Sequence, residues 1–184
     1  MKNSQMPEHR CCFNTERLAI RSWNSPYSGA VSEQKFAETV IRILTPRVTR
    51  SLPYGWQGIS TLSAASKWIN ERCGESRFLI VQLLSTNEIV GFIFLYGHPL
   101  PKKYYELRFG YLLTETIWGK GFGTELVKGL MEWCEKAGDI ASVSGGVEPE
   151  NIGSIKVLEK NGFTRLKTDQ STENVVFFKR TFIL

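Results

Sequence analysis

The residues with the clearest chemical meaning are three glycines, which alternate with other residues in the run Gly119-Lys120-Gly121-Phe122-Gly123. A strand-like segment precedes this run and a segment with helical spacing of apolar residues follows it, so the run should form the turn that begins a helix. The first N–H groups of a helix lack intrahelical partners and attract anions together with the helix dipole. Glycine lets an anion approach the backbone and tolerates positive φ. The turn is therefore predicted to bind a phosphate or pyrophosphate group.

Two familiar phosphate-binding patterns do not fit this turn. A Walker A loop requires G-x-x-x-x-G-K-[ST], but Gly123 is followed by Thr124 and Glu125. The dinucleotide pattern G-x-G-x-x-G, started at either of the first two glycines, would need another glycine where Thr124 or Leu126 stands. The spacing therefore speaks against nucleoside triphosphates and dinucleotides as ligands.

The turn resembles the pyrophosphate-binding motif of the GNAT superfamily of N-acetyltransferases, commonly Q/R-x-x-G-x-G/A, with Trp118 as the departure from it. Trp-Gly-Lys-Gly is a familiar form in the branch that resembles ribosomal-protein N-terminal (RimJ/RimL-like) acetyltransferases. Residues 151–163, NIGSIKVLEKNGF, resemble the family's other motif, N-x-x-S/A-x-x-[LV]-[LY]-E-K-x-G-F. With a Thr-Glu-Arg-Leu opening at residues 15–18, the resemblance covers about residues 15–181.

The resemblance implies acetyl-coenzyme A (acetyl-CoA) as the cosubstrate. The coenzyme-binding positions that it implies are Leu113, Thr114, Trp118, Gly119, Lys120, Gly121, Phe122, Gly123, Thr124, Asn151, Ser154 and Lys156. Two of these have plainer interpretations, because Asn151 is also a good helix N-cap and Lys120 could be a solvated loop charge. Lys156 would serve the same phosphates as Lys120 from the next helix.

In families of this kind the central sheet splays, and the pantetheine arm of the coenzyme lies in the gap like an added strand. Backbone groups near Leu113-Thr114 and Val147 would then bond the arm. Gly145 and Gly146 suit either a close backbone approach at this place or an ordinary bulge.

The resemblance also suggests catalytic groups. Other branches protonate the departing thiolate with a tyrosine at the position of Leu158, which leaves Ser154 as the acid candidate here. An amine must lose its ammonium proton before it attacks a carbonyl, and Glu106 is the candidate base. Glu106 could instead be a surface carboxylate paired with Arg108, which stands where the family usually has a glutamate.

These residues predict an acyltransferase of the N-acetyltransferase type, which moves the acetyl group directly from acetyl-CoA to a primary amine in a ternary complex. Without a histidine partner, a covalent Cys–His or Ser–His–Asp mechanism has little support. The amine would be a protein N-terminus or a small molecule, and the motifs do not say which. The alternative is a non-catalytic acyl-CoA-binding sensor, because Leu158 and Arg108 depart from the family pattern.

The elements that must position these residues follow from hydrophobic periodicity and turn residues. Strands are expected near residues 17–21, 77–84, 89–96, 105–113, 141–147, 163–167 and 174–183, and helices near 28–44, 61–73, 121–137 and 151–161. Antiparallel hairpins then alternate with βαβ crossovers. The order predicts an α/β (α+β) fold with a mixed, largely antiparallel sheet of about six to seven strands and helices on both faces. The loop at 45–60 could be a packed connector or a lid over the substrate.

Composition limits the class of protein further. The 184 residues suit one domain, expected at 15–184 after a loose leader at 1–14. The net charge of +5 favours anionic partners. The sequence lacks a basic run with interleaved aromatic residues, so it does not indicate a nucleic-acid partner. Four cysteines without C-x-x-C spacing and two histidines argue against a metal site. No apolar run is long enough for a membrane span, so a cytoplasmic protein with reduced thiols is expected. The protein is expected to be a monomer or a homodimer.

Overall fold

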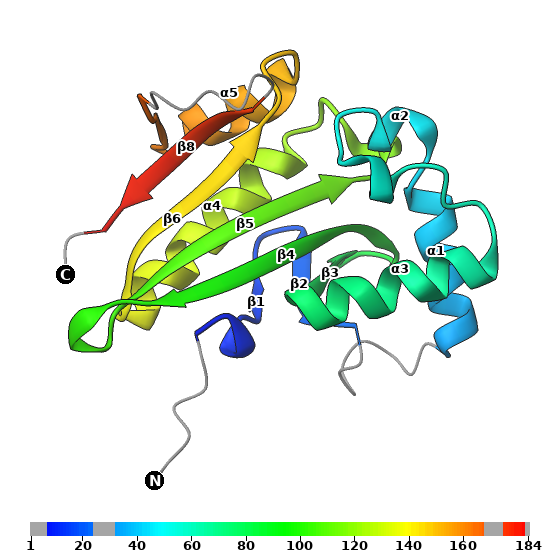
Figure 1. Ribbon diagram of the computed structural model, residues 1–184, viewed down its shortest axis with the longest axis horizontal. Coiled ribbons are helices and arrows are strands. Elements are labelled where there is room, and N and C mark those ends of the chain that lie inside the picture. Colours follow the sequence, from blue (N-terminus) through cyan, green and yellow to red (C-terminus); the bar gives the residue numbers. More distant parts are fainter. Residues whose placement is uncertain (1–6, 24–31, 168–174, 183–184) are drawn as a thin grey trace, which may run out of the picture.

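The structure is a computed structural model that describes residues 7–23, 32–167 and 175–182. Its centre is one sheet of eight strands in the order β1-β2-β3-β4-β5-β6-β8-β7 (Figure 1). The strands are β1 Phe13–Asn14, β2 Leu18–Ser22, β3 Arg77–Leu83, β4 Ile89–Pro99, β5 Tyr105–Leu113, β6 Ile140–Val147, β7 Thr164–Arg165 and β8 Val176–Thr181. Every neighbouring pair is antiparallel except β5 and β6. The predicted mixed, largely antiparallel sheet is therefore confirmed.

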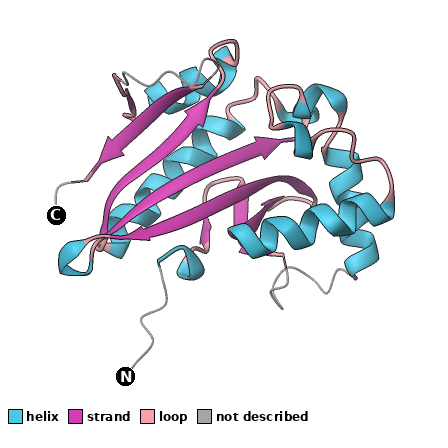
Figure 2. Ribbon diagram, viewed as in Figure 1, coloured by secondary structure: helices cyan, strands magenta, loops and turns pink. Residues whose placement is uncertain are grey.

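Helices lie on both faces of this sheet, as predicted (Figure 2). They are α1 Glu33–Ile43, α2 Pro46–Thr49, α3 Leu62–Glu75, α4 Phe122–Ala137 and α5 Ile152–Lys160. Short 3-10 helices occupy Pro7–Arg10, Tyr54–Trp56, Pro101–Lys103 and Glu115–Ile117. Residues 28–31 of the predicted first helix lie outside the described residues, and Ser32 caps the observed one. The third helix passes through Gly74, although the sequence predicted that it would stop there.

The sheet has more strands than the six to seven expected, because a short strand occurs within the predicted leader. Phe13 and Asn14 pair with Ile20 and Ala19 of β2. Cys11, just before this strand, is 1% exposed and belongs to the hydrophobic core. The expectation of a loose leader is therefore wrong for residues 7–14. Two strand residues are too few to show alternation in a sequence.

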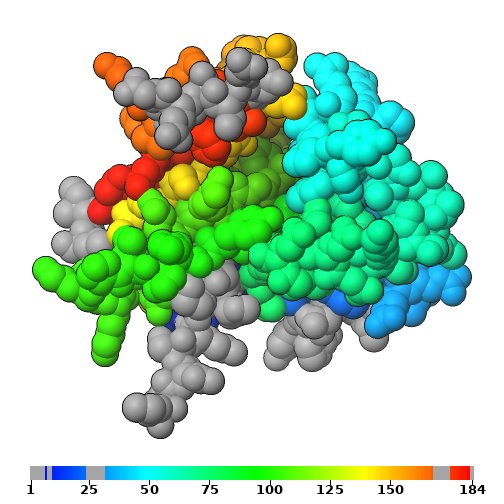
Figure 3. Space-filling model, in the orientation of Figure 1, coloured from blue at the N-terminus to red at the C-terminus, as the bar shows by residue number. Residues whose placement is uncertain are grey.

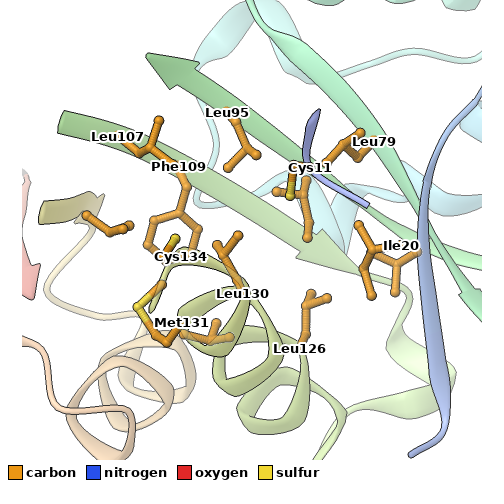
Figure 4. Close-up of a cluster of buried hydrophobic side chains, with 14 of the residues drawn as sticks. Cys11, Ile20, Leu79, Leu95, Leu107, Phe109, Leu126, Leu130, Met131 and Cys134 are labelled. Atoms are coloured by element: carbon orange, nitrogen blue, oxygen red, sulfur yellow. The ribbon is translucent and has the colours of Figure 1, made fainter. Parts of the chain in front are cut away.

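The helices pack on the sheet through two hydrophobic clusters, one on each face. On one face, Leu126, Leu130 and Cys134 of α4 point toward sheet residues that include Leu79 and Leu107 (Figure 4). On the other face, Phe36 of α1 and Trp68 of α3 pack on Phe78, Phe92 and Phe94. The spacing of apolar residues in α4 had predicted this buried stripe, and Gly138 ends the helix at φ 73°. Among the described residues, no helix is both long and apolar enough to cross a membrane.

Candidate functional site

The parallel strands β5 and β6 separate before they end. They pair from Tyr105 opposite Ile140 to Arg108 opposite Ser144, and β5 then continues to Leu113 while β6 continues to Val147. We call the end of this pairing, at Arg108 and Ser144, the vertex. Beyond it β6 stays paired with β8 as far as Val147. The sheet is therefore splayed at this parallel pair, as the resemblance implied.

The two neighbouring glycines of β6 allow close packing at the start of this gap. A Cβ on Gly145 would lie 3.2 Å from the carbonyl oxygen of Phe109, which is tighter than almost all real contacts. The pairing of β6 with β8 runs in continuous register through Gly145 and Gly146. There is therefore no bulge between β6 and β8 at these glycines, and Gly145 lies close to Phe109, whereas a close approach of the coenzyme arm stays a prediction.

The glycine turn forms the outer end of the gap. Gly119 and Gly121 have φ values of 72° and 83°, a conformation that side chains disfavour, and α4 begins directly afterwards. The first N–H groups of any helix lack intrahelical partners. Within the described ranges, no side chain caps this end of α4 either, so these groups are available to a ligand. A Cβ on Gly123 would lie 3.3 Å from Val157 Cγ2 and 3.8 Å from the Tyr111 hydroxyl. The turn thus joins the N-terminus of a long helix to β5 and α5, as an anion-binding cradle requires.

A cavity of about 610 Å³ opens at this turn. In the space-filling view the surface is hollowed between residues after α1, in cyan, and those around α5, in yellow and orange (Figure 3). The predicted coenzyme-binding residues that line it are Leu113, Trp118, Gly119, Gly121, Phe122, Gly123, Thr124, Asn151, Ser154 and Lys156. Residues some 40 positions apart in the sequence therefore meet around one cavity.

Two predicted coenzyme contacts and the predicted base do not line this cavity. Thr114 is buried, and its backbone N–H donates to the Val90 carbonyl at 2.8 Å. Lys120 is exposed and its ammonium donates to the carbonyl of Thr116 at 2.8 Å. The plainer interpretation of Lys120, as a loop charge outside the site, therefore agrees with its position.

An ion pair between distant segments holds the glycine turn. Glu125 in the first turn of α4 accepts a hydrogen bond from Arg17 Nε at 2.6 Å and another from Thr15 Oγ1 at 2.5 Å. Arg17 also covers the Phe122 ring at 3.9 Å and donates to the carbonyl of Lys120 at 3.2 Å. Burial would raise the pKa of Glu125, but the bonds from Thr15 and Arg17 outweigh it and lower that pKa. The Thr-Glu-Arg-Leu opening thus braces the anion cradle.

Trp118 fixes the other side of the turn. Its indole N–H donates to the carbonyl of Leu113 at 2.8 Å, which ties the turn to the end of β5. Arg47 lies over the indole ring at 5.5 Å and pairs with Glu115 at 3.2 Å. The residue that departs from the common family motif therefore has a structural role of its own.

Two hydroxyl groups meet at the inner wall of the cavity. Asn151 caps α5 by accepting a bond from the Ser154 backbone N–H at 3.1 Å, which confirms its role as N-cap. The Tyr111 hydroxyl, on β5, donates to Ser154 Oγ at 3.5 Å. Burial raises the pKa of Tyr111, partly offset by the bond with Ser154, so the phenol is protonated at neutral pH and can donate a proton. Tyr111 was not among the predicted site residues, because nothing in the sequence places it beside residue 154.

Glu106 lies two residues before the vertex, away from the hydroxyl pair. The ammonium of Lys179 bonds its carboxylate, and Ser142 Oγ donates to it at 2.8 Å. The bond from Lys179 and then that from Ser142 hold the pKa of Glu106 below its usual range. The suggested pairing with Arg108 does not occur, since Arg108 lies over the ring of Phe177 at 5.9 Å.

Part of the loop at 45–60 is a packed connector, part of it lines the cavity, and its role as a lid over the substrate stays a prediction. Trp56 packs edge-on against Trp68 and Phe94 of the core, as a connector would. Residues 47, 48 and 50–52 instead line the cavity, and they add Arg47 and Arg50 to its wall. Sequence reasoning could not divide the loop, because periodicity does not say which side of a short helix faces a cavity.

The buried cysteines do not take part in this site. Cys134 lies in the core, and burial raises the pKa of its thiol strongly. A thiol in this state is a poor nucleophile. No cluster of three side chains able to ligate a metal occurs in the described part of the chain.

Comparison with known proteins gives this arrangement a family. A family profile described as "Acetyltransferase (GNAT) domain" matches residues 30–164. The probable N-acetyltransferase YjcK of Bacillus subtilis is 39% identical over 54 residues, a match that spans 29% of this chain and 30% of that protein.

Solved structures share the fold along nearly the whole chain. A GNAT-family acetyltransferase from Bacillus anthracis matches with a TM-score of 0.70 and 21% identity, over 93% of this chain and 98% of that one. RimL, the ribosomal L7/L12 α-N-protein acetyltransferase in complex with coenzyme A, matches with a TM-score of 0.71 and 18% identity over the same shares. The resemblance to the RimJ/RimL-like branch thus extends to the fold. Because the family match spans most of the chain, the chain belongs to the GNAT acetyltransferase family and is an acyltransferase.

Proposed function

We propose that this protein transfers the acetyl group of acetyl-CoA directly to a primary amine while both substrates are bound. The observation that carries the proposal is the cavity, which joins an anion-binding helix N-terminus to a pair of hydroxyl groups beside a splayed parallel strand pair. One end suits a pyrophosphate, the gap suits an extended arm, and the hydroxyls suit the departure of a thiolate. GNAT acetyltransferases take their acetyl group from acetyl-CoA.

The residues present fit the coenzyme. The free N–H groups after Gly121 would hold the pyrophosphate, with Lys156 on the cavity wall to balance its charge. Backbone groups of Leu113 and Val147 border the gap and would bond the pantetheine arm as a neighbouring strand does. The indole of Trp118 already occupies one lone pair of the Leu113 carbonyl, which leaves the second for the arm.

Ser154 and Tyr111 would act together as the acid. When the amine nitrogen bonds to the acetyl carbon, the bond to sulfur breaks and the thiolate takes a proton. Ser154 Oγ lies on the cavity wall and can give that proton while it receives another from the Tyr111 hydroxyl. The nitrogen of the new amide releases its extra proton to solvent, and Tyr111, which also lines the cavity and whose pKa burial raises, takes a proton back from solvent. Tyr111 thereby supplies the phenol that Leu158 does not, which favours an enzyme over a sensor.

Glu106 is proposed to receive the ammonium proton of the acceptor through water. It lies two residues before the vertex, about 7 Å along the strand, because each strand residue advances about 3.3 Å. Its carboxylate is ionised at neutral pH, and the bond from Lys179, the largest cause, lowers its pKa further below the ordinary value. A lowered pKa also weakens it as a base, so it fits a relay in which a water makes the direct contact.

Acceptors can be tested with a panel of primary amines and N-terminal peptides, measuring release of free thiol from acetyl-CoA. N-terminal peptides are the first acceptors to try, because RimL, which shares the fold, is an α-N-protein acetyltransferase. Amine-dependent thiol release with intersecting double-reciprocal plots is the expected result. Measured coenzyme binding without thiol release for any acceptor would favour the acyl-CoA sensor, and parallel plots would contradict direct transfer.

A further inference from the structure

The face of the sheet opposite α4 and α5 carries an exposed cation at the vertex. Leu107 and Phe109 point into the core beneath α4, so the alternation of β5 turns Glu106 and Arg108 to the opposite face. In Figure 1 this side of β6 and β8 is open to the viewer, while α4 passes behind the strands. Arg108 is exposed there and belongs to the last residue pair before the strands separate. We call this surface the open face.

The other charges on the open face near Arg108 compensate one another. Lys179 forms an ion pair with Glu106, and Ser142 completes the bonds of that carboxylate. Within the described ranges, the side chain of Arg108 has neither an ion pair nor a hydrogen bond, and its guanidinium contacts the ring of Phe177. No carboxylate of the described residues therefore compensates the positive charge at the vertex, and the contact with Phe177 helps to hold the guanidinium in place.

The coenzyme has no need of this charge. The cations on the wall of the coenzyme cavity are Arg47, Arg50, Lys156 and Lys160, whereas Arg108 does not line it. A thioester reaching the vertex along the gap would meet the acceptor at the place where Arg108 stands. A guanidinium there forms strong, often bidentate hydrogen bonds with a carboxylate or phosphate.

From this arrangement we propose that the acceptor amine carries a carboxylate a few bonds from its nitrogen, and that Arg108 binds that carboxylate. This inference rests on the proposed function and specifies its substrate class. The exposed guanidinium of Arg108 attracts an anionic group of the acceptor and repels a cationic one. Glu106 does not repel such an acceptor, because Lys179 neutralises it.

The test compares matched acceptors that differ in one carboxylate, at a pH at which the amines of both are largely neutral. One pair consists of a free amino acid and its amide. The other pair consists of two short amidated peptides that differ only in their second residue, which is Asp in one and Asn in the other. We expect kcat/KM of the wild-type protein to be at least about tenfold higher for the carboxylate member of one pair, and the pair that responds identifies the source of the carboxylate.

Substitution of the arginine then assigns the preference. Arg108→Gln should lower kcat/KM for the carboxylate acceptor about ten- to a hundredfold, mainly through KM, and leave the amide acceptor within about twofold. Arg108→Lys should keep part of the preference. Arg165→Gln is the matched control, because Arg165 is exposed on β7 and pairs with Phe178, whose side chain faces the other side of the sheet. Coenzyme affinity should be unchanged in all variants.

The outcomes separate this inference from the proposed function. Turnover without a charge preference, or equal losses for both members of a pair in Arg108→Gln, would overturn the role of Arg108 and leave the acetyltransferase activity standing. If no amine in either pair or in the wider panel is acetylated, the proposed function fails and this inference fails with it.

Discussion

At the scale of single residues, the chemistry rests on a contact between Ser154 and Tyr111. A coenzyme thiol has a pKa near that of cysteine, about 8.5, so its thiolate is a fair leaving group and needs modest help from an acid. Two hydroxyls that pass a proton from one to the other can give that help without a charged group as the acid. The protonated phenol, which burial favours, is the terminal donor of this pair.

Removing either hydroxyl should slow the chemical step. We expect Ser154→Ala and Tyr111→Phe each to lower kcat roughly tenfold, with coenzyme affinity nearly unchanged. The loss is smaller than general acid catalysis usually contributes, because a thiolate needs only modest help. The double variant should lose less than the product, because both residues serve one proton path. Tyr105→Phe, at the far end of β5, is the matched control for initial-rate kinetics. A fully additive double variant would argue against a shared path.

The role of Glu106 can be tested through its pKa. The bond from Lys179 is the largest cause of the lowered pKa, so Lys179→Met should raise the pKa of Glu106 toward its usual range. Loss of activity on acidification would then begin at a higher pH than in the wild type, measured as kcat/KM between about pH 3 and 7. Glu106→Gln should remove this limb. A profile that is the same in the wild type and Lys179→Met would contradict a proton-relay role for Glu106.

Sequence reasoning found the residues that carry a local signal. The glycines and Asn151 can be recognised in the sequence, because a position with positive φ or at a helix N-cap accepts few residue types. The contact of Tyr111 with Ser154 joins residues 43 positions apart, and the ion pair of Glu106 joins it to a residue 73 positions away. Such partners depend on how the strands are placed in the sheet, which no local pattern records.

At the scale of elements, the position of α4 decides whether the cradle exists. Hydrophobic spacing predicted where this helix begins and ends, and the structure confirms both. The clamp of Thr15 and Arg17 on Glu125 was not predictable, because it bridges more than 100 residues. The clamp fixes the first turn of α4 relative to β2 and holds the free N–H groups toward the cavity.

The clamp should also make stability depend on pH. The folded-state pKa of Glu125 lies below its ordinary value of 4.5, so its stabilising effect is present above that value and is lost as pH falls through the folded pKa. At neutral pH we expect Glu125→Gln to lower the free energy of unfolding by about 1–3 kcal/mol, the usual range for a hydrogen-bonded charge. Denaturant titrations at several pH values should show this difference shrinking below about pH 4.

A control for the clamp lies on the same helix. Glu132 is exposed and faces Lys128 at 3.8 Å, so Glu132→Gln should cost at most about 0.5 kcal/mol. A difference for Glu125→Gln that stays constant from neutral to acid pH would contradict the ion-pair account and indicate a loss of packing instead.

At the scale of the whole molecule, we propose that the coenzyme and the acceptor bind to one sheet at a single gap, each on a different surface. The coenzyme cavity lies where α4, α5 and the segment after α1 meet, and the open face carries Arg108 at the vertex. The order of hairpins and crossovers in the sequence was enough to predict this mixed sheet. It could not supply β1, which is two residues long, or show that Cys11 is buried.

The most direct measurement is a calorimetric titration of acetyl-CoA into the wild type, Gly121→Val and Gly138→Val. Both glycines flank α4 in the left-handed region, with φ 83° and 73°, so both substitutions should cost a similar amount of stability, about 1–2 kcal/mol. Only Gly121 lines the coenzyme cavity. The account predicts binding at least about tenfold weaker for Gly121→Val, or about 1.4 kcal/mol, and binding within about twofold of wild type for Gly138→Val. Equal affinities in all three proteins would contradict the assignment of the glycine turn to the coenzyme pyrophosphate.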